Sequence, residues 1–223
     1  MRTGASAVTT FDAVVAIFYT SYKVKVFDFL FSFGTFLPCA DIFIQRSKPH
    51  VKFRFAKINI RMKILITGHN GFIGRNMMSW MLNEGWDVHG WSIGEEEFPK
   101  VEDYQWVVHL GAVTNPNERD VDRILKLNLE FSQELFKKCQ QEEVHFQYAS
   151  TYQVYGNTKD FTESSMCYPD NPYAWSKYLF DRWVFRQPNY HSYVQGFRYF
   201  NVYGKYMHYS KTNNVISKWR FQA

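Results

Sequence analysis

The pattern of apolar and polar positions divides the chain near Met62. Beyond this point, short apolar runs alternate with segments of helical periodicity. Residues 1–61 instead hold Phe-rich stretches and a basic stretch in which neither periodicity is sustained. Three interpretations of this leader are open: a membrane-surface anchor, an extension private to this chain, or non-native sequence upstream of a true start at Met62. We favour the third and assign no function to the leader.

After Met62, the apolar runs predict strands and the periodic segments predict helices. The runs are short and rich in β-branched residues, which suits strands buried in a parallel sheet. The predicted strands are Lys63–Thr67, Asp87–Trp91, Trp106–Leu110, His145–Ala149 and Ser192–Tyr199, and the predicted helices are Arg75–Asn83, Val121–Gln140 and Tyr173–Phe185. Strands that alternate with helices predict a doubly wound α/β fold around a parallel sheet.

Composition is that of a folded protein without an obvious macromolecular partner. A hydrophobic content of 46% argues against disorder. The net charge of +5 fits an acidic ligand such as a nucleotide diphosphate, but ordinary surface lysines explain it more simply. No long basic run indicates nucleic-acid binding, and no apolar run approaches the ~20 residues that span a bilayer. Cys39, Cys139 and Cys167 lie far apart, so we expect no disulfide framework, no metal site and a cytoplasmic location.

Three glycines follow the first predicted strand at regular spacing. Gly68 suits a tight turn, Gly71 allows the backbone to approach a pyrophosphate, and Gly74 allows close packing of the next helix. The N-terminus of that helix offers free N–H groups and a positive dipole end to phosphates. The strand before the loop and the helix after it favour a Rossmann-type site for NAD or NADP. The alternative is a structural turn that binds nothing.

The end of the second predicted strand does not decide between the two cofactors. A carboxylate there would bind the ribose 2′-hydroxyl of NAD. The strand ends near Trp91 and Ser92, and Glu95, Glu96 and Glu97 follow only in a predicted loop. Arg75 could approach the 2′-phosphate of NADP, although a solvated helix residue is the simpler interpretation. The choice between NAD and NADP therefore stays open.

Tyr173 and Lys177 form a candidate catalytic pair. They follow Asn171-Pro172, which signals the start of a helix, and residues four apart share one helix face. An ammonium group and an oxidised nicotinamide would both stabilise a phenolate and lower the pKa of Tyr173 from about 10. Such a tyrosine could take a hydroxyl proton while hydride leaves carbon. The alternative is two neighbours on a wet helix face.

From Met62 to Gly204, the chain resembles the extended short-chain dehydrogenases/reductases, the family of sugar-nucleotide epimerases and dehydratases. Six motifs agree with the family in order and spacing. Within it, the phrase Gly196–Gly204 looks most like ADP-glycero-manno-heptose 6-epimerases, with UDP-glucose 4-epimerases second. The motifs are Thr67–Gly74, His109–Ala112, Asn128, Ser150-Thr151 before Val154–Gly156, Tyr173–Lys177 and Arg198–Gly204.

The resemblance implies a role for each matching residue. Tyr173 would be the general base, Lys177 its pKa partner and a ligand of the nicotinamide ribose, and Thr151 would bind the reacting oxygen. Asn128 would support an active-site water and Lys177, and Asn201 would contact substrate phosphates. The implied cofactor contacts are Gly68, Asn70, Gly71, Phe72, Ile73, Gly74, Leu110, Gly111, Ala112, Asn128, Tyr173, Lys177 and Tyr199.

The chain departs from the family pattern at several places. Tyr152 and Gln153 stand where family dehydratases have Asp-Glu, so dehydration is not expected. Lys211 matches the second basic lysine of the heptose epimerases only after a one-residue shift. The stretch between Trp91 and Trp106 is too short for the usual third strand and its helix, which predicts a reduced adenine side of the pocket.

The resemblance implies an epimerase that acts on a nucleotide sugar: hydride leaves a sugar carbon and returns to the opposite face. The alternatives are a keto-sugar-nucleotide reductase, a non-catalytic NAD(P)-binding module and an inert fragment. The last two are considered because residues 205–223 resemble only the start of the family's substrate lobe, after a nucleotide-binding domain at 62–204. A homodimer is possible through the helix of Tyr173 and the helix that follows Asn128. Trp175, Phe180 and Trp183 could serve it, although core packing is expected for most of them.

Overall fold

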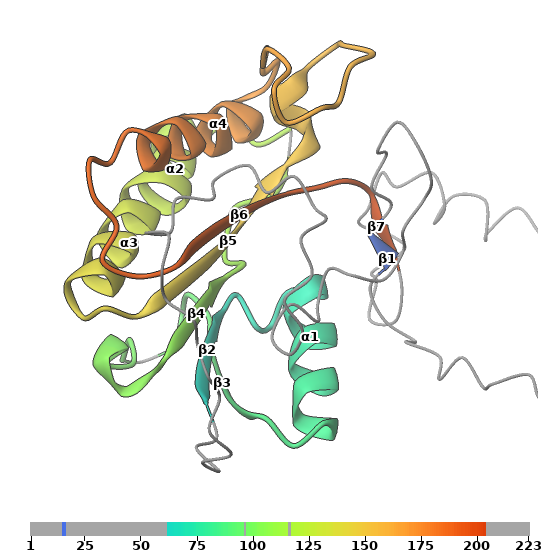
Figure 1. Cartoon of the computed structure of the whole chain (residues 1–223). Helices are drawn as coiled ribbons and strands as arrows, with labels where there is room; N and C mark the ends of the chain where they lie inside the picture. Colours follow the sequence, from blue (N-terminus) through green and yellow to red (C-terminus); the bar gives the residue numbers. More distant parts are fainter. Residues whose placement is uncertain (1–14, 17–61, 96, 116, 204–223) are drawn as a thin grey trace, which may run out of the picture.

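The computed structural model describes residues 15–16, 62–95, 97–115 and 117–203. Within these ranges, five parallel strands form one sheet in the order β3-β2-β4-β5-β6 (Figure 1). All five predicted strands are present, with ends shifted by a few residues at most. They are β2 (Lys63–Thr67), β3 (Asp87–Trp91), β4 (Trp106–His109), β5 (His145–Thr151) and β6 (Val194–Tyr199).

Helices cover both faces of the sheet, so the doubly wound prediction is confirmed. Figure 1 shows α1 on one face and α2, α3 and α4 together on the other. A π-helical turn, Lys126–Glu130, joins α2 to α3, so the predicted helix Val121–Gln140 is a single helical segment with a π-turn inside it. The helices are α1 (Phe72–Asn83), α2 (Val121–Leu125), α3 (Phe131–Gln141) and α4 (Pro172–Phe185).

The core follows from the two-residue alternation of the central strands. Ile64 and Ile66 of β2 face α1 and pack in one cluster with Met77 and Met81. Leu65, between them, faces the other way and belongs to the cluster beneath α3 and α4. Full burial of each such aliphatic side chain contributes about 1.5–3 kcal/mol. The alternation therefore fixes which helices lie on which face.

The first helix begins earlier than predicted, at Phe72 rather than Arg75. Gly71 is still extended, with φ −74° and ψ 172°, and its carbonyl accepts the N–H of Arg75 at 2.9 Å. The glycine spacing had suggested a loop as far as Gly74, but a glycine inside the first turn is tolerated because tertiary packing outweighs its low helix propensity. The predicted start of α4 is confirmed: Pro172 opens the helix, and the side chain of Asn171 accepts the N–H of Ala174 at 2.8 Å.

The third strand and helix of the usual arrangement are absent from the described part of the segment between Trp91 and Trp106, as predicted. The regular element there is a 3-10 turn, Val101–Asp103. Aromatic packing fills the space beside it: the ring of Trp91 lies 4.8 Å from that of Phe98 and 5.7 Å from that of Phe131. This leaves β3 at the edge of the sheet.

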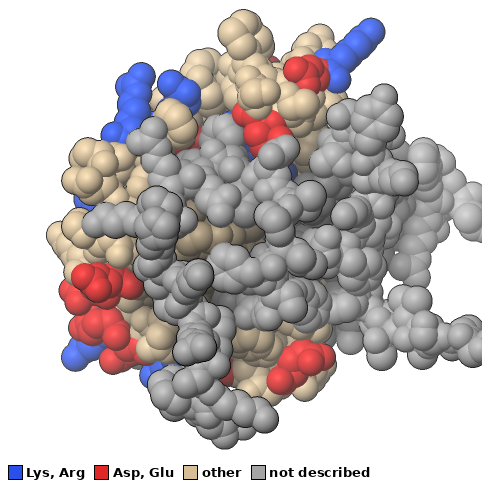
Figure 2. Space-filling view, in the orientation of Figure 1, with Lys and Arg blue, Asp and Glu red and all other residues tan. Residues whose placement is uncertain are grey.

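Outside the sheet, β1 (Val15–Ala16) pairs antiparallel with β7 (Val202–Tyr203). The other predictions on residues 1–61 and 205–223, including the one on Lys211, lie outside the described residues. None of the helices among the described residues is long and apolar enough to cross a membrane. On the face drawn in Figure 2, the basic side chains of described residues stand apart from one another, and acidic groups also lie on that face.

Candidate active site

The residues predicted to form a site gather at the carboxyl edge of the sheet. In the parallel ladders, Thr67 of β2 pairs in register with His109 of β4, and Thr151 of β5 pairs with Tyr199 of β6. Each of these four residues ends its strand and is buried. Ligands of open α/β sheets bind at this edge, beyond the carboxyl ends of the strands.

Two of the three loop glycines are required by packing. Gly68 has φ +73°, and a Cβ there would lie 2.6 Å from the Cα of Gly111 in the loop after β4. A Cβ on Gly74 would overlap the carbonyl oxygen of Gly68 and lie 2.6 Å from the Cα of His69. Gly71 is different, because a Cβ there would meet only the Gly68 carbonyl, at 3.2 Å. Packing therefore explains Gly68 and Gly74, whereas Gly71 leaves its exposed backbone accessible to a ligand.

The start of α1 has the properties of a phosphate site. No side chain caps the helix, and its first turn contains no acidic residue. The backbone N–H groups of this turn and the positive end of the helix dipole therefore face the glycine loop without a protein anion to satisfy them. Phe72 and Ile73 are half-buried beside the loop. These residues fit the diphosphate of a dinucleotide.

Glu95 reaches back to the end of β3, which the sequence pattern did not reveal. Its Oε2 accepts the backbone N–H of Ser92 at 2.7 Å, and its Oε1 accepts the side-chain amide of Asn70 at 2.9 Å. The Nε2 of His69 lies 3.6 Å from the same Oε1. The carboxylate therefore bridges the strand end and the glycine loop. The N–H of Glu95 also closes a turn on the carbonyl of Ser92, which brings the carboxylate back to the strand end.

His109 is a second residue to which sequence reasoning assigned no role. Its Nδ1 lies 2.6 Å from Oγ1 of Thr67, and its Nε2 lies 2.8 Å from Oγ of Ser132. Ser132 donates its proton to the carbonyl of Asn128, so it accepts from His109 Nε2–H, and Nδ1 accepts from Thr67. Burial lowers the pKa of His109 to about 3, which keeps the ring neutral and this direction fixed.

Asn128 lies in the π-helical turn and is fully buried. Its Oδ1 accepts the N–H of Val113 at 2.8 Å, and its Nδ2 donates to the Val113 carbonyl at 3.0 Å and to Ser176 Oγ at 3.1 Å. Ser176 precedes Lys177 on α4. Asn128 thus connects the loop after β4 to the helix that carries the Tyr-Lys pair, and its predicted support of a water stays a prediction.

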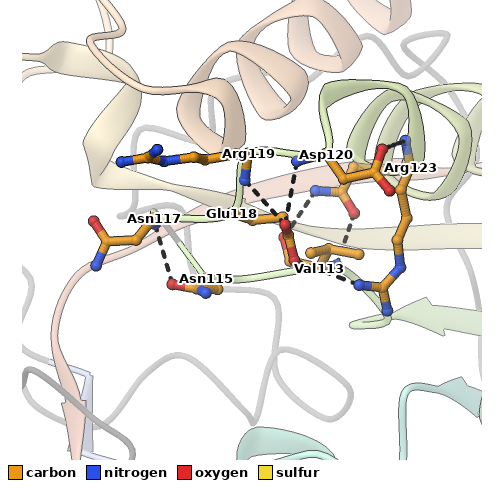
Figure 3. A network of polar contacts seen from close by, with 8 residues as sticks. Val113, Asn115, Asn117, Glu118, Arg119, Asp120 and Arg123 are labelled. Carbon is orange, nitrogen blue, oxygen red and sulfur yellow. Dashed lines mark hydrogen bonds and ion pairs between the residues drawn. The ribbon is translucent and has the colours of Figure 1, made fainter.

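The rest of the loop after β4 is tied to the start of α2 (Figure 3). Glu118 Oε1 accepts the backbone N–H groups of Arg119 and Asp120 at 2.9 and 3.2 Å, and its Oε2 pairs with Arg123 at 3.4 Å. Asp120 caps the helix by accepting the N–H of Arg123 at 2.9 Å. Leu110, Gly111 and Ala112, the predicted cofactor contacts in this loop, are half-buried between β4 and this anchored segment.

The three predicted catalytic residues share one buried site. Tyr173, Lys177 and Thr151 are exposed by only 9%, 2% and 4%. Thr151 Oγ1 accepts the N–H of Gln153 at 3.3 Å, which leaves its hydroxyl proton free to donate. Tyr173 and Lys177 therefore do not lie on a wet helix face.

The protein groups alone do not produce the lowered pKa that we expected for Tyr173. Burial raises it to about 12, although the hydrogen bond from Thr151 opposes the rise. Burial also lowers the pKa of Lys177 to about 8, so the ammonium form is less strongly favoured over the neutral amine near neutral pH. In the protein without cofactor, desolvation of the phenolate dominates, and the lowered pKa expected with the oxidised nicotinamide in place stays a prediction.

The remaining predicted residues have simple placements. Tyr199 is buried at the end of β6, and burial raises its pKa. Asn201 is exposed just beyond that strand. At the positions of the dehydratase carboxylates, the ring of Tyr152 stacks on Phe200 at 5.2 Å, and the amide oxygen of Gln153 accepts from the side chain of Asn171 at 3.0 Å.

Solved structures share this fold. A short-chain dehydrogenase/reductase from Agrobacterium tumefaciens with bound NAD is 27% identical, with a TM-score of 0.53 over 61% of this chain and 48% of that one. The Helicobacter pylori ADP-L-glycero-D-manno-heptose-6-epimerase is 23% identical, with a TM-score of 0.59 over 70% and 60% of the two chains. A UDP-N-acetylglucosamine 4-epimerase from Methanobrevibacter ruminantium, in complex with UDP-N-acetylmuramic acid, is 21% identical, with a TM-score of 0.61 over 70% and 61%.

The chain spans 48% to 61% of the length of these three structures. A family model provides the stronger link, because it matches residues 64–223, from the first strand of the sheet onward. The matched region contains the glycine loop, the Tyr173–Lys177 helix and the strands that place Thr151 and Tyr199. By this match the chain belongs to the NAD-dependent epimerase/dehydratase family.

Proposed function

We propose that this chain is an NAD(P)-dependent sugar-nucleotide epimerase with Tyr173 as its general base. The observation that carries the proposal is the burial of Thr151, Tyr173 and Lys177 at the ends of β5 and α4, with Lys177 one helical turn from Tyr173 on the same face of α4. The cluster lies at the sheet edge that also holds the glycine loop, where a bound dinucleotide and a sugar would meet.

The proposed roles combine the placement of these side chains with the family resemblance. Thr151 would hold the reacting hydroxyl oxygen, and Tyr173 would take its proton. When bound, the oxidised cofactor supplies the hydride acceptor and a positive charge beside the phenol. Tyr173 would return the proton after the hydride returns to the other face of the sugar, so that the carbon is inverted and no net oxidation occurs. Lys177 would hold the nicotinamide ribose, and Asn201 the substrate phosphates.

The pKa of Tyr173 makes this proton transfer dependent on bound cofactor. With a pKa of about 12, Tyr173 is protonated at neutral pH in the protein alone. An added positive charge in a buried site lowers the pKa of a neighbouring phenol, because it stabilises the phenolate in a low dielectric. The base would therefore form only when the nicotinamide is in place, which limits unproductive proton exchange.

The position of Glu95 favours NAD over NADP. Its carboxylate, 39% exposed, lies at the end of β3 beside the glycine loop, where a carboxylate would bind ribose hydroxyls. A 2′-phosphate at the same place would meet a fixed negative charge. Arg75, which could favour NADP, is an exposed residue of α1.

The other enzyme reactions of the family are weaker candidates. Dehydration would need a carboxylate acid or base after Thr151, whereas Tyr152 and Gln153 occupy those positions with an aromatic stack and an amide hydrogen bond. A keto-sugar-nucleotide reductase would use the same Tyr173 and Lys177, but it would consume NAD(P)H in each turnover. A non-catalytic NAD(P)-binding module would use the glycine loop without Tyr173. Because the chain spans about half of the structures it matches, the whole reaction stays part of the proposal.

The decisive experiment titrates the purified full chain with NADH and NADPH and follows nucleotide fluorescence together with thermal stability. We expect saturable binding, tighter for NADH, with a raised melting temperature. UDP-glucose and an ADP-heptose are then incubated with the chain and NAD, and epimers are detected by NMR. A Tyr173→Phe variant should bind NADH but form no epimer. Absence of NADH binding by the folded chain would refute the proposal, and net conversion of NAD to NADH without an epimer would favour the reductase working in reverse.

We also propose that α4 contributes to a homodimer. Trp175, Leu179 and Phe185 are exposed by 47%, 39% and 52% along this helix. Phe180, considered for this role, is 1% exposed and belongs to the core, and Trp183 packs against the same core cluster. Analytical ultracentrifugation should detect a dimer that Trp175→Glu dissociates, while a monomer at all concentrations would refute it. Cytoplasmic location stays a prediction.

A further inference from the structure

A buried ion pair lies one helical turn beyond Lys177 on α4. Nε of Arg198 is 3.3 Å from Oδ2 of Asp181, and the two side chains are only 6% and 1% exposed. The hydroxyl of Ser150 donates to the same Oδ2 at 2.8 Å. Asp181 comes from α4, Ser150 from β5 and Arg198 from β6, so one carboxylate oxygen joins three elements.

The strand members of this cluster adjoin the site. Ser150 pairs with Arg198 in the parallel ladder, and the next pair is Thr151 with Tyr199. The ion pair is thus one step back along each strand from the two site residues, and it holds the ends of β5 and β6 to α4.

The helix member adjoins the catalytic pair. Asp181 follows Lys177 by one turn, just as Lys177 follows Tyr173, so all three lie on one face of α4. Asp181 is the carboxylate that acts on Lys177 among the described residues. His109, facing Lys177 from β4, is neutral because burial lowers its pKa to about 3. Asp181 therefore supplies the negative charge that acts on Lys177.

Burial raises the pKa of Asp181, and Arg198 is the main group that opposes the rise. The hydroxyl of Ser150 and Lys177 also oppose it. An arginine stays protonated even when buried, so the 3.3 Å contact joins two charges. Three further titratable groups, Tyr148 of β5, Tyr155 and Cys167, face this pair, and burial raises the pKa of each, so they are neutral at pH 7.

We propose that Asp181 is a positioning residue for Lys177: fixed by Ser150 and Arg198, its carboxylate holds Lys177 as an ammonium ion and orients the Tyr173–Lys177 face toward the ends of β5 and β6. The inference rests on the proposed function only for what Lys177 does in the reaction. The protonation of Lys177 is measurable without substrate or cofactor, so the two proposals fail independently.

The test labels lysines with ¹³C at Cε and follows their NMR signals with pH in the full chain. The Lys177 signal is identified by its absence from a Lys177→Met variant. We expect a wild-type midpoint near pH 8. Asp181→Asn should lower the midpoint by about one pH unit or more, because the carboxylate is lost and the Arg198 charge remains. Ser150→Ala, the matched control, removes a hydrogen bond without changing any charge and should shift it by less than about half a unit.

A second variant tests the proposal even if Asp181→Asn does not fold. The double variant Asp181→Asn/Arg198→Gln removes both charges, so it avoids an unpaired buried cation and should fold even if Asp181→Asn does not. If Asp181 positions Lys177, the Lys177 midpoint of the double variant should still lie below the wild-type midpoint. An unchanged midpoint in a folded Asp181→Asn chain, or in the double variant, would overturn the proposal.

A last measurement separates this inference from the proposed function. NADH affinity is compared at pH 6.5 and 8 in wild type and Asp181→Asn. We expect Asp181→Asn to lose affinity at a lower pH than wild type does, because Lys177 would bind the ribose as an ammonium ion. If neither chain binds NADH while the Lys177 midpoint still moves, the proposed function fails and the role of Asp181 stands.

Discussion

The side chains of Thr67 and His109 join the ends of two neighbouring strands through a 2.6 Å contact between Oγ1 and Nδ1. The backbone N–H of Gly111 points at the same Oγ1 from 3.4 Å, and Ser132 continues the chain on the other side of the ring. Only a neutral imidazole fits this order of donors and acceptors, because a protonated ring has no acceptor for the Thr67 hydroxyl. The glycine loop is thereby connected to the Asn128 turn through one buried histidine.

This arrangement predicts a sensitivity to acid. The folded pKa of His109 is about 3 against 6.5 for an ordinary histidine. Between these values the unfolded chain binds a proton that the folded chain does not, so stability is complete above pH 6.5 and falls as the pH drops toward 3. At pH 5 the loss from His109 is about 2 kcal/mol. Urea unfolding at pH 7 and pH 5 measures it.

The control for this prediction is His109→Gln, which should be less stable at pH 7 but should lose about 2 kcal/mol less than wild type between pH 7 and pH 5. His145, whose pKa burial also lowers, contributes equally to both proteins. Equal losses in wild type and variant would contradict the assignment to His109.

The buried charge of Lys177 should lower the stability of the folded chain, although the same residue is proposed to bind the cofactor. Its folded pKa of about 8 lies below the ordinary 10.5, so below pH 8 the charged form is favoured more in the unfolded chain. Stability should therefore rise with pH between 8 and 10.5, by roughly 3 kcal/mol in total. Lys177→Met should raise the melting temperature at pH 7 and flatten that pH dependence, while NADH binding weakens. A lower melting temperature for this variant would show that contacts of the ammonium outweigh its desolvation.

Substitutions at two loop glycines should have different effects, one on folding and the other on cofactor binding. Gly74→Ala places a Cβ against the Gly68 carbonyl and the His69 backbone, which cannot move aside, and should destabilise the fold by about 3 kcal/mol or more. Gly71→Ala meets a single backbone oxygen at 3.2 Å and has an ordinary φ of −74°, so it should remain folded. NADH titration of Gly71→Ala should nevertheless show a large loss of affinity. Full affinity would mean that no phosphate approaches this backbone.

Glu95 should set the cofactor preference. Glu95→Gln keeps hydrogen-bonding atoms near Ser92 and Asn70 but removes the charge, so NADPH should bind about tenfold more tightly, a change of about 1.4 kcal/mol. Glu97→Gln, an exposed change of the same charge close by, is the matched control and should alter the NADH to NADPH ratio little. Similar ratios in wild type and both variants would place the adenosine ribose elsewhere.

Local sequence signals were sufficient for the fold. Unbroken apolar runs in Lys63–Thr67 and Trp106–His109 indicate strands buried on both faces, because successive residues point to opposite faces and each needs an apolar layer. Asn171 and Pro172 determine the start of α4 by capping geometry within a few residues. Gly68 and Gly74 indicate the turn and the close approach of the helix to the sheet. The glycine spacing alone placed the start of the helix too late, at Arg75 rather than Phe72.

The electrostatics of the site were decided by tertiary structure. Residues far apart in the chain, such as Ser150, Asp181 and Arg198, meet only after the sheet and α4 pack. The return of Glu95 to the strand end depends in the same way on Asn70 in the glycine loop. The helix start at Asn171-Pro172 and the family resemblance, together with the spacing, identified Tyr173 and Lys177. The sequence contains no measure of desolvation, which is a property of everything packed around a group. Burial raises the pKa of Tyr173 in the protein without cofactor, and only the folded chain could reveal this.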